Sequence, residues 1–296
     1  MRFGIIINPI SGASGSRQDE GRRRRALAEH LTARLGVDAT IAMTDRRGHA
    51  ADLARDFVAA GVDTVIAWGG DGTVNEAAGP LIASSTSIGI VPSGSGDGLA
   101  RSVGLPLAPE AALENILTGS VAKIDVGWIA GRHFLNIAGV GFDAAVGVAF
   151  GKGPRRGAWG YAKNGLTLVW SYESRHYHVA IDDDVLTGRK FLVGFANGRE
   201  YGNGLVLAPD ADARDGWLDA VIVYGGSALR QLWRARRLGF RRREPAEGVL
   251  RTRTREATIT GEHLLCHADG ETFTTSGRID VRVTPRALGI RGLLTP

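Results

Sequence analysis

Apolar runs and amphipathic segments alternate along the first part of the chain. Residues 18–35 carry leucines at helical spacing between polar positions, which predicts a helix. Mostly apolar runs, typical of parallel strands that are buried on both faces, occur at residues 3–7, 63–68 and 87–91, and residues 37–43 alternate as in a strand, which gives four strands. Strands that alternate with helices at this spacing predict a doubly wound parallel α/β domain over residues 1–122.

The pattern changes from about residue 124 onward, where short strands follow one another with few helical segments between them. They are expected at residues 124–128, 134–138, 176–181, 191–195, 218–223, 257–260 and 279–283. This succession predicts a second, mainly antiparallel β-sandwich-like domain over residues 123–285. Helices are expected near residues 158–172 and 228–238. The C-terminal tail, about residues 286–296, is expected to pack back on the first domain.

The composition agrees with a globular protein of one large or two medium domains. The chain has 296 residues, of which 44% are hydrophobic and 23% charged, and these values exclude a disordered chain, a collagen and a coiled coil. The single cysteine, Cys266, excludes an intramolecular disulfide and a cysteine-rich zinc site. Neither a signal peptide nor an apolar stretch of ~20 residues is evident, so we expect a cytoplasmic, soluble protein.

A glycine-rich turn at residues 69–76 (GGDGTVNE) follows an apolar strand and precedes a helix. Glycines allow the backbone to approach a phosphate closely, and the N-terminus of the following helix offers N–H groups and the positive end of its dipole. The carboxylate of Asp71 would repel a phosphate unless a cation lies between them, which favours Mg²⁺. The alternative is a tight turn whose glycines serve geometry alone.

Two further turns have similar chemistry and favour the phosphate interpretation. Residues 8–12 (NPISG) follow the first strand, and residues 92–98 (PSGSGDG) follow the fourth. In an open parallel sheet, ligands bind at the carboxyl ends of the strands, where these three turns are expected to meet. The Walker sequence GxxxxGK[ST] does not occur in the chain, which excludes the common P-loop class.

The order of these motifs resembles the diacylglycerol kinase catalytic domain family, which includes the bacterial soluble lipid kinases and the sphingosine kinases. The resemblance continues through residues 196–204 (ANGREYGNG), 208–211 (APDA), 215–219 (DGWLD) and 269–271 (DGE), and so covers nearly the whole chain. The GGDGT motif by itself is less specific, because nicotinamide-dinucleotide kinases and phosphofructokinases share it.

The resemblance implies a kinase that uses ATP and Mg²⁺ to phosphorylate the hydroxyl of diacylglycerol or a similar long-chain lipid alcohol. It implies that Glu271 is the general base and that Asp71 positions the catalytic Mg²⁺ and the phosphates, in a cleft between the two domains. It places ATP on Asn8, Pro9, Ser11, Gly12, Thr44, Gly69, Gly70, Asp71, Gly72, Thr73, Asn75 and Ser95. A second Mg²⁺ would be held by Asp212, Asp215 and Trp217.

One departure from the family pattern lies in the turn after the fourth strand. The bacterial enzymes usually have Gly-Thr-x-Asn-Asp there, followed by an apolar residue, Ala and Arg, whereas this chain has GSGDGLAR at residues 94–101. A carboxylate is missing at Gly98 and another appears at Asp97. Neighbouring residues point in different directions, so Asp97 is a candidate phosphate or metal ligand but need not replace the missing group. The departure leaves the identity of the lipid open.

Positive charge is concentrated in one part of the chain. Residues 230–255 carry ten arginines and two glutamates, which gives +8, so the other 270 residues carry −3 of the total of +5. Leu, Trp and Phe residues alternate with these arginines, which suits a surface of anionic lipid. Candidate membrane contacts are Trp233, Arg234, Arg237 and Arg241.

Other interpretations of the basic residues stay open. The segment can instead form a solvated helix that docks on its own domain, whereas nucleic acid is disfavoured because no nucleic-acid-binding motif accompanies the charge. A second basic run, residues 22–25, is expected to lie on an exposed helix face.

These observations together predict an ATP-dependent lipid kinase that associates peripherally with membranes. Its expected partners are a lipid substrate at a membrane surface and anionic phospholipid, without nucleic acid, and a homodimer is left open. Two alternatives remain. One is a kinase of the same superfamily that acts on a soluble substrate, either a nicotinamide dinucleotide or a sugar. The other is a non-catalytic protein that binds a nucleotide or a lipid.

Overall fold

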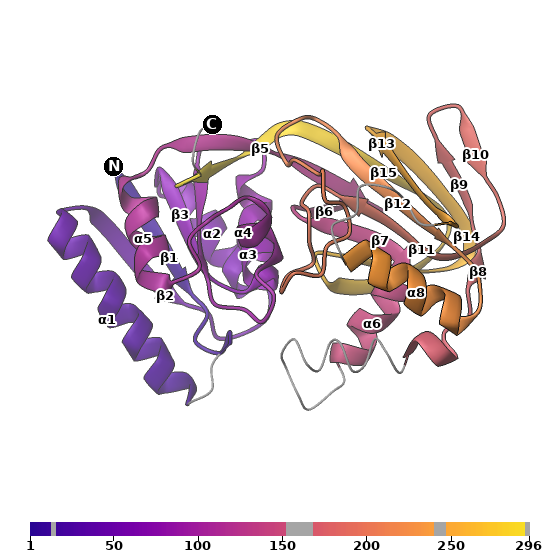
Figure 1. Ribbon diagram of the computed structural model, residues 1–296. Helices are drawn as coiled ribbons and strands as arrows, with labels where there is room; N and C mark the ends of the chain where they lie inside the picture. Colours follow the sequence, from indigo (N-terminus) through magenta and orange to yellow (C-terminus); the bar gives the residue numbers. More distant parts are fainter. Residues whose placement is uncertain (13–15, 152–167, 240–246, 294–296) are drawn as a thin grey trace. The chain divides into compact units, whose positions relative to one another are not determined.

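The computed structural model describes residues 1–12, 16–151, 168–239 and 247–293 (Figure 1). The chain divides into two compact units. The first comprises Met1–Ile124 and Arg286–Pro296, and the second comprises Asp125–Pro285. No helix in the described part of the chain is long and apolar enough to cross a membrane.

The first unit contains a parallel sheet whose central strands are buried on both faces. Its strands are β1 (Arg2–Ile7), β2 (Asp38–Met43), β3 (Thr64–Gly69) and β4 (Ser87–Pro92). They lie in the order β4-β3-β1-β2, and all three pairings are parallel. Every residue of β3 and β4 is buried, whereas β2 at the edge is only partly buried. The continuous apolar runs therefore mark the interior strands.

Helices cover both faces of this sheet. They are α1 (Arg17–Leu35), α2 (His49–Ala59), α3 (Asp71–Ala78), the 3-10 helix η1 (Gly79–Leu81), α4 (Gly98–Ser102) and α5 (Pro109–Thr118). Ile5 of β1 lies in one core with Leu31 of α1 and Leu113 of α5. On the other face, Phe57 of α2 packs over Gly4, where an added Cβ would lie 2.4 Å from the ring. Adjacent residues of one strand thus face opposite helical layers, as the doubly wound prediction requires.

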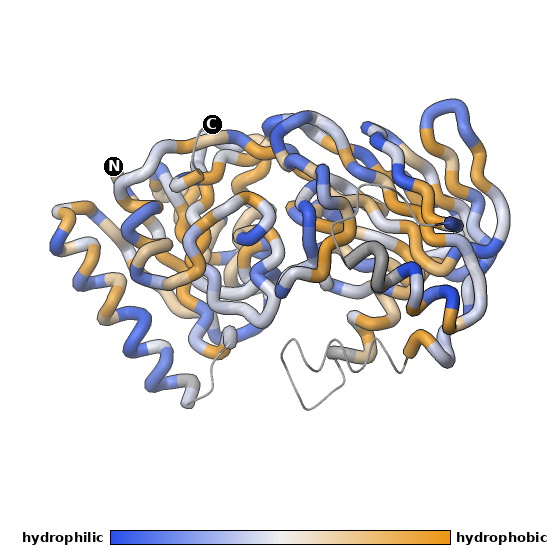
Figure 2. The backbone as a smooth tube through the Cα atoms, viewed as in Figure 1, coloured by the Kyte–Doolittle hydropathy of each residue, from blue (hydrophilic) through white to orange (hydrophobic). Residues whose placement is uncertain are grey.

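Local sequence explains where α1 begins and ends. The hydroxyl of Ser16 accepts a hydrogen bond from the N–H of Asp19, and Gly36 adopts the left-handed conformation that ends a helix. Hydrophilic and hydrophobic residues are interspersed along this helix (Figure 2), and its buried residues include Ala28 and Leu31.

The last residues of the chain belong to the first unit. Ile290, near the end of β15 (Glu271–Arg291), pairs in parallel with Ile88 of β4. The amide of Asn115 donates a hydrogen bond to the carbonyl of Gly292 at 2.7 Å. The C-terminal end therefore completes the sheet of the first unit.

The second unit is built mainly from antiparallel strands. They are β5 (Val121–Ile129, which begins in the first unit), β6 (Arg132–Phe134), β7 (Ile137–Gly141), β8 (Arg175–His176), β9 (His178–Ile181), β10 (Asp184–Leu186), β11 (Arg189–Ala196), β12 (Leu218–Tyr224), β13 (Val249–Thr254), β14 (Glu256–Ala268) and the greater part of β15. The central order is β13-β12-β11-β7-β14-β15, and each of these pairings is antiparallel.

Two cores lie on opposite faces of β11. Val193 and Phe195 belong to the core shared with β14 and β15, and Leu192 and Ala196 belong to a second core. Helices α6 (Phe142–Gly151) and α8 (Ala228–Gly239) contribute residues to the second core. The fold class is therefore as predicted: an α/β domain followed by a β-sandwich-like domain. Of the helix expected near residues 158–172, residues 168–171 are helical and residues 158–167 lie outside the described part.

Candidate active site

The turns that follow β1, β3 and β4 are joined by hydrogen bonds at one edge of the first unit's sheet. The Nδ2 of Asn8, after β1, donates to the Oγ1 of Thr73 at 2.8 Å. The Oγ of Ser11 donates to the carbonyl of Ser93, after β4, at 3.1 Å. The carboxyl ends of parallel strands meet at one edge, so these segments converge although they are distant in sequence.

Glycine is required where the three turns touch. Gly12 has a φ of +62°, and an added Cβ would lie 2.2 Å from the carbonyl oxygen of Ser93. A Cβ on Gly94 would lie 2.7 Å from the Cα of Gly70. Side chains at these positions would occupy the space in which the backbones meet, so the glycines leave a surface of bare peptide groups.

The N-terminus of α3 opens onto this edge without a side-chain cap. Gly70 is the N-cap residue and offers no side chain to the N–H groups of the first turn. Such a helix end carries N–H groups and partial positive charge, which suit a phosphate. Gly69, Gly72 and Asn75 belong to the same strand-to-helix segment, and Ser95 is exposed in the turn after β4.

The carboxylates of Asp71 and Asp97 both contact the turn after β4. Asp71 accepts hydrogen bonds from the N–H groups of Gly98 at 3.2 Å and Leu99 at 3.4 Å. Asp97 has a φ of +49° and accepts the N–H of Gly94 at 2.8 Å. Burial raises the pKa of Asp97 above its usual range. Asp97 thus closes its own turn, and Gly98 supplies an N–H to Asp71.

Arg24 of α1 joins the turn after β1 to the turn after β4 through hydrogen bonds. Its guanidinium donates to the carbonyl of Asn8 at 2.6 Å, the carbonyl of Ser11 at 2.7 Å and the hydroxyl of Ser93 at 3.1 Å. The residue is 5% exposed, so the expectation that residues 22–25 lie on an exposed helix face is wrong for this position. The missed signal is the spacing of the buried residues on α1: Gly21, Arg24, Ala28 and Leu31.

A fourth segment reaches the same edge after β2. Thr44 is buried, and its N–H donates to the carbonyl of Ile7 at 2.9 Å. Farther along this segment, the N–H of Gly48 donates to the side chain of Glu76 on α3 at 3.0 Å. These bonds place the segment beside the turns after β1 and β3. Pro9 is buried in the turn after β1.

In the second unit, Asp269 anchors the hairpin turn that carries Glu271. Its carboxylate accepts three consecutive backbone N–H groups, from Leu135 at 2.7 Å, Asn136 at 2.9 Å and Ile137 at 3.1 Å. Asp269 and Gly270 both have positive φ, as the two central residues of a tight hairpin turn require. Glu271 begins β15 and is half-buried. The structure therefore places Glu271 directly after an anchored turn.

Two buried asparagines support the segment that binds Asp269. The Nδ2 of Asn197 donates to the carbonyls of Asp125 at 3.0 Å and Leu135 at 2.7 Å. The Nδ2 of Asn136 donates to the carbonyl of Glu200 at 2.9 Å. Buried amides that satisfy backbone carbonyls in this way stiffen loops. Sequence reasoning did not single out Asn136, because its partners are more than 60 residues away.

A buried polar cluster lies directly beside the same hairpin. The Nε2 of His267 is 2.8 Å from the Oδ2 of Asp143, to which the hydroxyl of Tyr201 donates at 3.1 Å. The N–H of Gly270 donates to the Nδ1 of His267 at 3.4 Å. With Nδ1 accepting, the Nε2 of His267 carries the proton that is shared with Asp143. This cluster adds a second support under the turn.

In the acidic loop predicted to hold a second Mg²⁺, both aspartates contact arginine side chains. The carboxylate of Asp212 accepts the Nε of Arg214 at 3.2 Å, and that of Asp215 is paired with Arg253. The ring of Trp217 lies 5.4 Å from the guanidinium of Arg253. Among the described residues, no group of three or more His, Cys, Asp and Glu side chains is placed to hold a metal ion. The second metal site therefore stays a prediction.

The candidate membrane contacts on α8 differ in exposure. Trp233 is 47% exposed. Arg234 is 4% exposed and donates to the carbonyls of Tyr224 at 2.6 Å and Glu247 at 2.9 Å. The side chain of Arg234 is therefore internal and stabilises the position of α8, and the expectation that it contacts lipid is wrong. The side chain of Arg237 and the whole of Arg241 lie outside the described residues.

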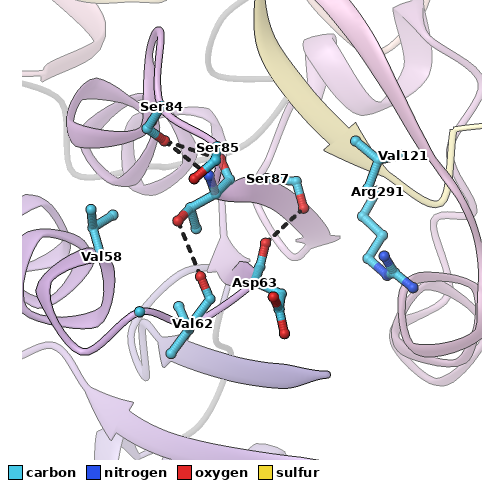
Figure 3. Close-up of a pocket in the computed structure, with 10 residues that line it drawn as sticks. Val58, Val62, Asp63, Ser84, Ser85, Ser87, Val121 and Arg291 are labelled. Carbon is cyan, nitrogen blue, oxygen red and sulfur yellow. Dashed lines mark hydrogen bonds between the residues drawn. The ribbon is translucent and has the colours of Figure 1, made fainter.

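The pocket in Figure 3 has a volume of 450 Å³ and lies away from these turns. It is lined by Val62 and Asp63 before β3, by Ser84 to Ser87 at the start of β4, and by Arg291. These residues mark the amino ends of the strands, the edge opposite to the one where ligands bind in such sheets. The hydroxyl of Ser87 already donates to the carbonyl of Asp63 at 3.2 Å. None of the predicted site residues lines it.

Comparison with known families accounts for both units. Residues 2–129 match the diacylglycerol kinase catalytic domain, and residues 136–292 match the YegS C-terminal NAD kinase beta sandwich-like domain. The chain belongs to the YegS-like family of lipid kinases. It is therefore a kinase, a transferase of phosphoryl groups, and the resemblance found in the sequence is confirmed.

Individual YegS-like relatives agree with this assignment. A probable lipid kinase of Chromohalobacter salexigens is 35% identical over 77% of this chain and 73% of its own length. A probable lipid kinase of Pseudomonas aeruginosa is 31% identical over 76% and 80%. A crystal structure of a putative diacylglycerol kinase from Bacillus anthracis shares the fold, with a TM-score of 0.77 and 22% identity over 100% of this chain and 98% of that chain.

Proposed function

We propose that this YegS-like lipid kinase transfers the γ-phosphate of ATP, with Mg²⁺, to the hydroxyl of diacylglycerol or a similar long-chain lipid alcohol. The observation that carries the proposal is the meeting of three glycine-containing turns at the uncapped N-terminus of α3. Membership of a lipid kinase family supports the choice of a lipid acceptor.

The first unit has the chemistry to bind a triphosphate. Arg24 engages the carbonyls of Asn8 and Ser11, so the carbonyl oxygens of this turn are drawn toward the guanidinium and away from an anion. Because Gly70 and Gly94 carry no side chains, the turns after β3 and β4 pack backbone against backbone beside the uncapped N-terminus of α3, whose N–H groups suit phosphate oxygens. Asp71 would hold Mg²⁺ through a carboxylate oxygen, and the bound ion would offset the negative charge of the phosphates.

The second unit supplies the base. The carboxylate of Glu271 takes the proton of the lipid hydroxyl as its oxygen forms a bond to the γ-phosphorus. The bond between that phosphorus and the bridging oxygen of ATP breaks, and ADP leaves with the electron pair. Asp269 holds the turn through three hydrogen bonds, so Glu271 loses little conformational freedom when it meets the hydroxyl.

Glu271→Gln tests the proposal in a phosphate-transfer assay with Mg-ATP and a panel of lipids in mixed micelles. We expect the wild type to phosphorylate a long-chain lipid alcohol, and the variant to lose about 10³-fold in kcat with ATP affinity unchanged. Glu262→Gln is the matched control, because Glu262 is an exposed glutamate on β14 of the same unit.

Three outcomes would contradict parts of this proposal. Wild-type rates in the Glu271→Gln variant would remove Glu271 as the base. Turnover of a nicotinamide dinucleotide or a sugar, without turnover of any lipid, would replace the acceptor class. ATP binding without turnover of any acceptor would favour a non-catalytic nucleotide-binding protein.

A further inference from the structure

The outer face of α8 exposes large apolar side chains. Leu229 is 68% exposed and Trp233 is 47% exposed. They are four residues apart and therefore lie on one face of the helix. Arg230 is exposed beside them, and these three residues line a shallow groove of 360 Å³ together with Glu247. An exposed Leu and Trp on one helix face are unusual enough to require an explanation.

Internal hydrogen bonds fix the direction in which this face points. Arg234, one residue beyond Trp233, is buried and donates to the carbonyls of Tyr224 and Glu247. Gln231 is also buried and donates to the carbonyl of Tyr224 at 2.9 Å. Because these two residues hold the inner side of α8 against its own unit, Leu229 cannot rotate inward without breaking their bonds.

A second exposed tryptophan comes from a distant part of the sequence. Trp170 is 61% exposed, and its neighbour Val169 is buried in the core that also receives Leu232 of α8. The segment that carries Trp170 runs up to the start of α8, since a Cβ on Gly225 would lie 3.1 Å from the Cβ of Ser174. We call Trp170, Leu229, Arg230 and Trp233 the docking patch.

Among the described residues, exposed charges of both signs lie near the docking patch. Exposed arginines near it are Arg175, Arg189 and Arg230, and exposed acids are Glu173 and Glu247. The sequence from residue 230 to residue 243 contains seven arginines and no acidic residue. Tryptophan and leucine between cationic side chains suit the boundary between headgroups and acyl chains, where the rings meet the hydrocarbon and the cations meet phosphate.

We propose that the docking patch binds the surface of an anionic phospholipid membrane and holds the kinase there peripherally. The choice of partner rests on the proposed function, because a long-chain lipid alcohol resides in a bilayer. The geometry assigns the contact to Leu229, Trp233 and Trp170 together with Arg230, and it assigns Arg234 to support of the helix.

Co-sedimentation with vesicles of equimolar phosphatidylglycerol and phosphatidylcholine tests the patch independently of catalysis. We expect Leu229→Ser and Trp233→Ser each to reduce the vesicle partition coefficient about tenfold, because each removes an apolar side chain that the lipid buries in the bound state. Val185→Ser is the matched control, because Val185 is 66% exposed on β10 of the same unit. Arg230→Gln should weaken binding and reduce its dependence on salt.

A second measurement uses milder changes that retain an apolar ring. In the Trp170→Phe, Trp233→Phe double variant we expect vesicle binding to persist, and quenching of tryptophan fluorescence by brominated lipids to fall. Transfer to a short-chain, water-soluble lipid alcohol separates the two proposals. The serine variants should keep this activity and lose transfer to substrate in vesicles, whereas failure of the proposed function would remove both activities from the wild type while vesicle binding persists.

The docking patch would be overturned by sedimentation of the serine variants equal to that of the wild type. Unchanged quenching in the double phenylalanine variant would also exclude it. If the serine substitutions instead convert a dimer to a monomer in light scattering, without a change in vesicle binding, the face is an interface between copies of this chain.

Discussion

Arg24 in the first unit holds turns of the candidate nucleotide site, and Asp269 in the second holds the turn that leads to the candidate base Glu271, but the two residues carry opposite charges. Arg24 donates to the carbonyls of Asn8 and Ser11, whereas Asp269 accepts the N–H groups of residues 135–137. A cation that binds carbonyls leaves a turn suited to an anion. The carboxylate of Asp269 instead occupies N–H groups of another segment and so anchors the hairpin turn that leads to Glu271.

The two turns also differ in what allows them to form. In the first unit, bare glycine backbones touch, and a Cβ on Gly94 would lie 2.7 Å from the Cα of Gly70. In the second unit, side-chain hydrogen bonds stabilise the turn, since Asn136 and Asn197 support the segment that binds Asp269. The first arrangement depends on the absence of side chains and the second on their presence, so substitutions should damage them in different ways.

The largest effect on stability is expected for Asp269→Ala, which removes three hydrogen bonds to a carboxylate. Three backbone N–H groups would lose their partner, at a cost of about 3 kcal/mol, which lowers Tm by about 6–10 °C. Because the turn then no longer holds Glu271 in a defined position, kcat should fall about 100-fold even where the variant is folded. Asp269→Asn retains an acceptor and tolerates the positive φ, so it should recover part of both losses in thermal unfolding and transfer assays. Equal damage from both substitutions would contradict the role of the hydrogen bonds.

A smaller effect, on the nucleotide rather than on stability, is expected for Arg24→Lys. Lysine lacks the planar fork that reaches the carbonyls of Asn8 and Ser11 together, so the turn should loosen and the Kd for ATP should rise about tenfold. Arg25→Lys is the matched control, because Arg25 is exposed and pairs only with Glu29 among the described residues. Calorimetric titration with Mg-ATP measures both variants. Unchanged affinity in Arg24→Lys would show that the guanidinium does not shape the site.

The smallest effect concerns Asp219 on β12, a carboxylate without the three-donor cradle of Asp269. Burial raises the pKa of Asp219 to about 6 from its ordinary value of 3.8, against the attraction of Arg253. The folded state therefore binds this proton more tightly than the unfolded state, and wild-type stability falls as pH rises from about 4 through 6. Asp219→Asn should be more stable than the wild type by about 1 kcal/mol at pH 7, after allowance for solvent screening, and equal to it near pH 4.

Denaturant unfolding at the two pH values tests this expectation, and Asp183→Asn, at an exposed position in the same unit, serves as the control. A stability difference between Asp219→Asn and the wild type that is independent of pH would contradict the assignment.

Much of the first unit's candidate site could be predicted because its requirements are local. The turns at residues 8–12, 69–76 and 92–98 each stand directly after an apolar run, and the sheet brings them to one edge. A glycine that must tolerate positive φ or a close backbone contact is visible in the sequence itself. The departure at Asp97 and Gly98 was also visible, but its consequence was not, because the partner of Gly98 is Asp71, 27 residues earlier.

Three features could not be predicted because their causes lie far along the chain. Arg24 looked like one member of a solvated basic run, and only the packing of α1 shows that it is buried against two turns. Arg234 looked like a lipid contact, and its bonds to Tyr224 and Glu247 make it internal. Asp269 was visible only as part of the motif at residues 269–271, because its anchoring partners precede it by more than 130 residues.

The sequence by itself determined the two domains' classes, the family, the glycine turns and the concentration of positive charge between residues 230 and 255. Each follows from local spacing, from backbone freedom or from counting. The tertiary structure decided which charged residues are internal, because a guanidinium or carboxylate is buried only where backbone partners from other segments satisfy it. It also decided that Val169, next to Trp170, shares a core with Leu232 of α8, since only folding brings these segments together.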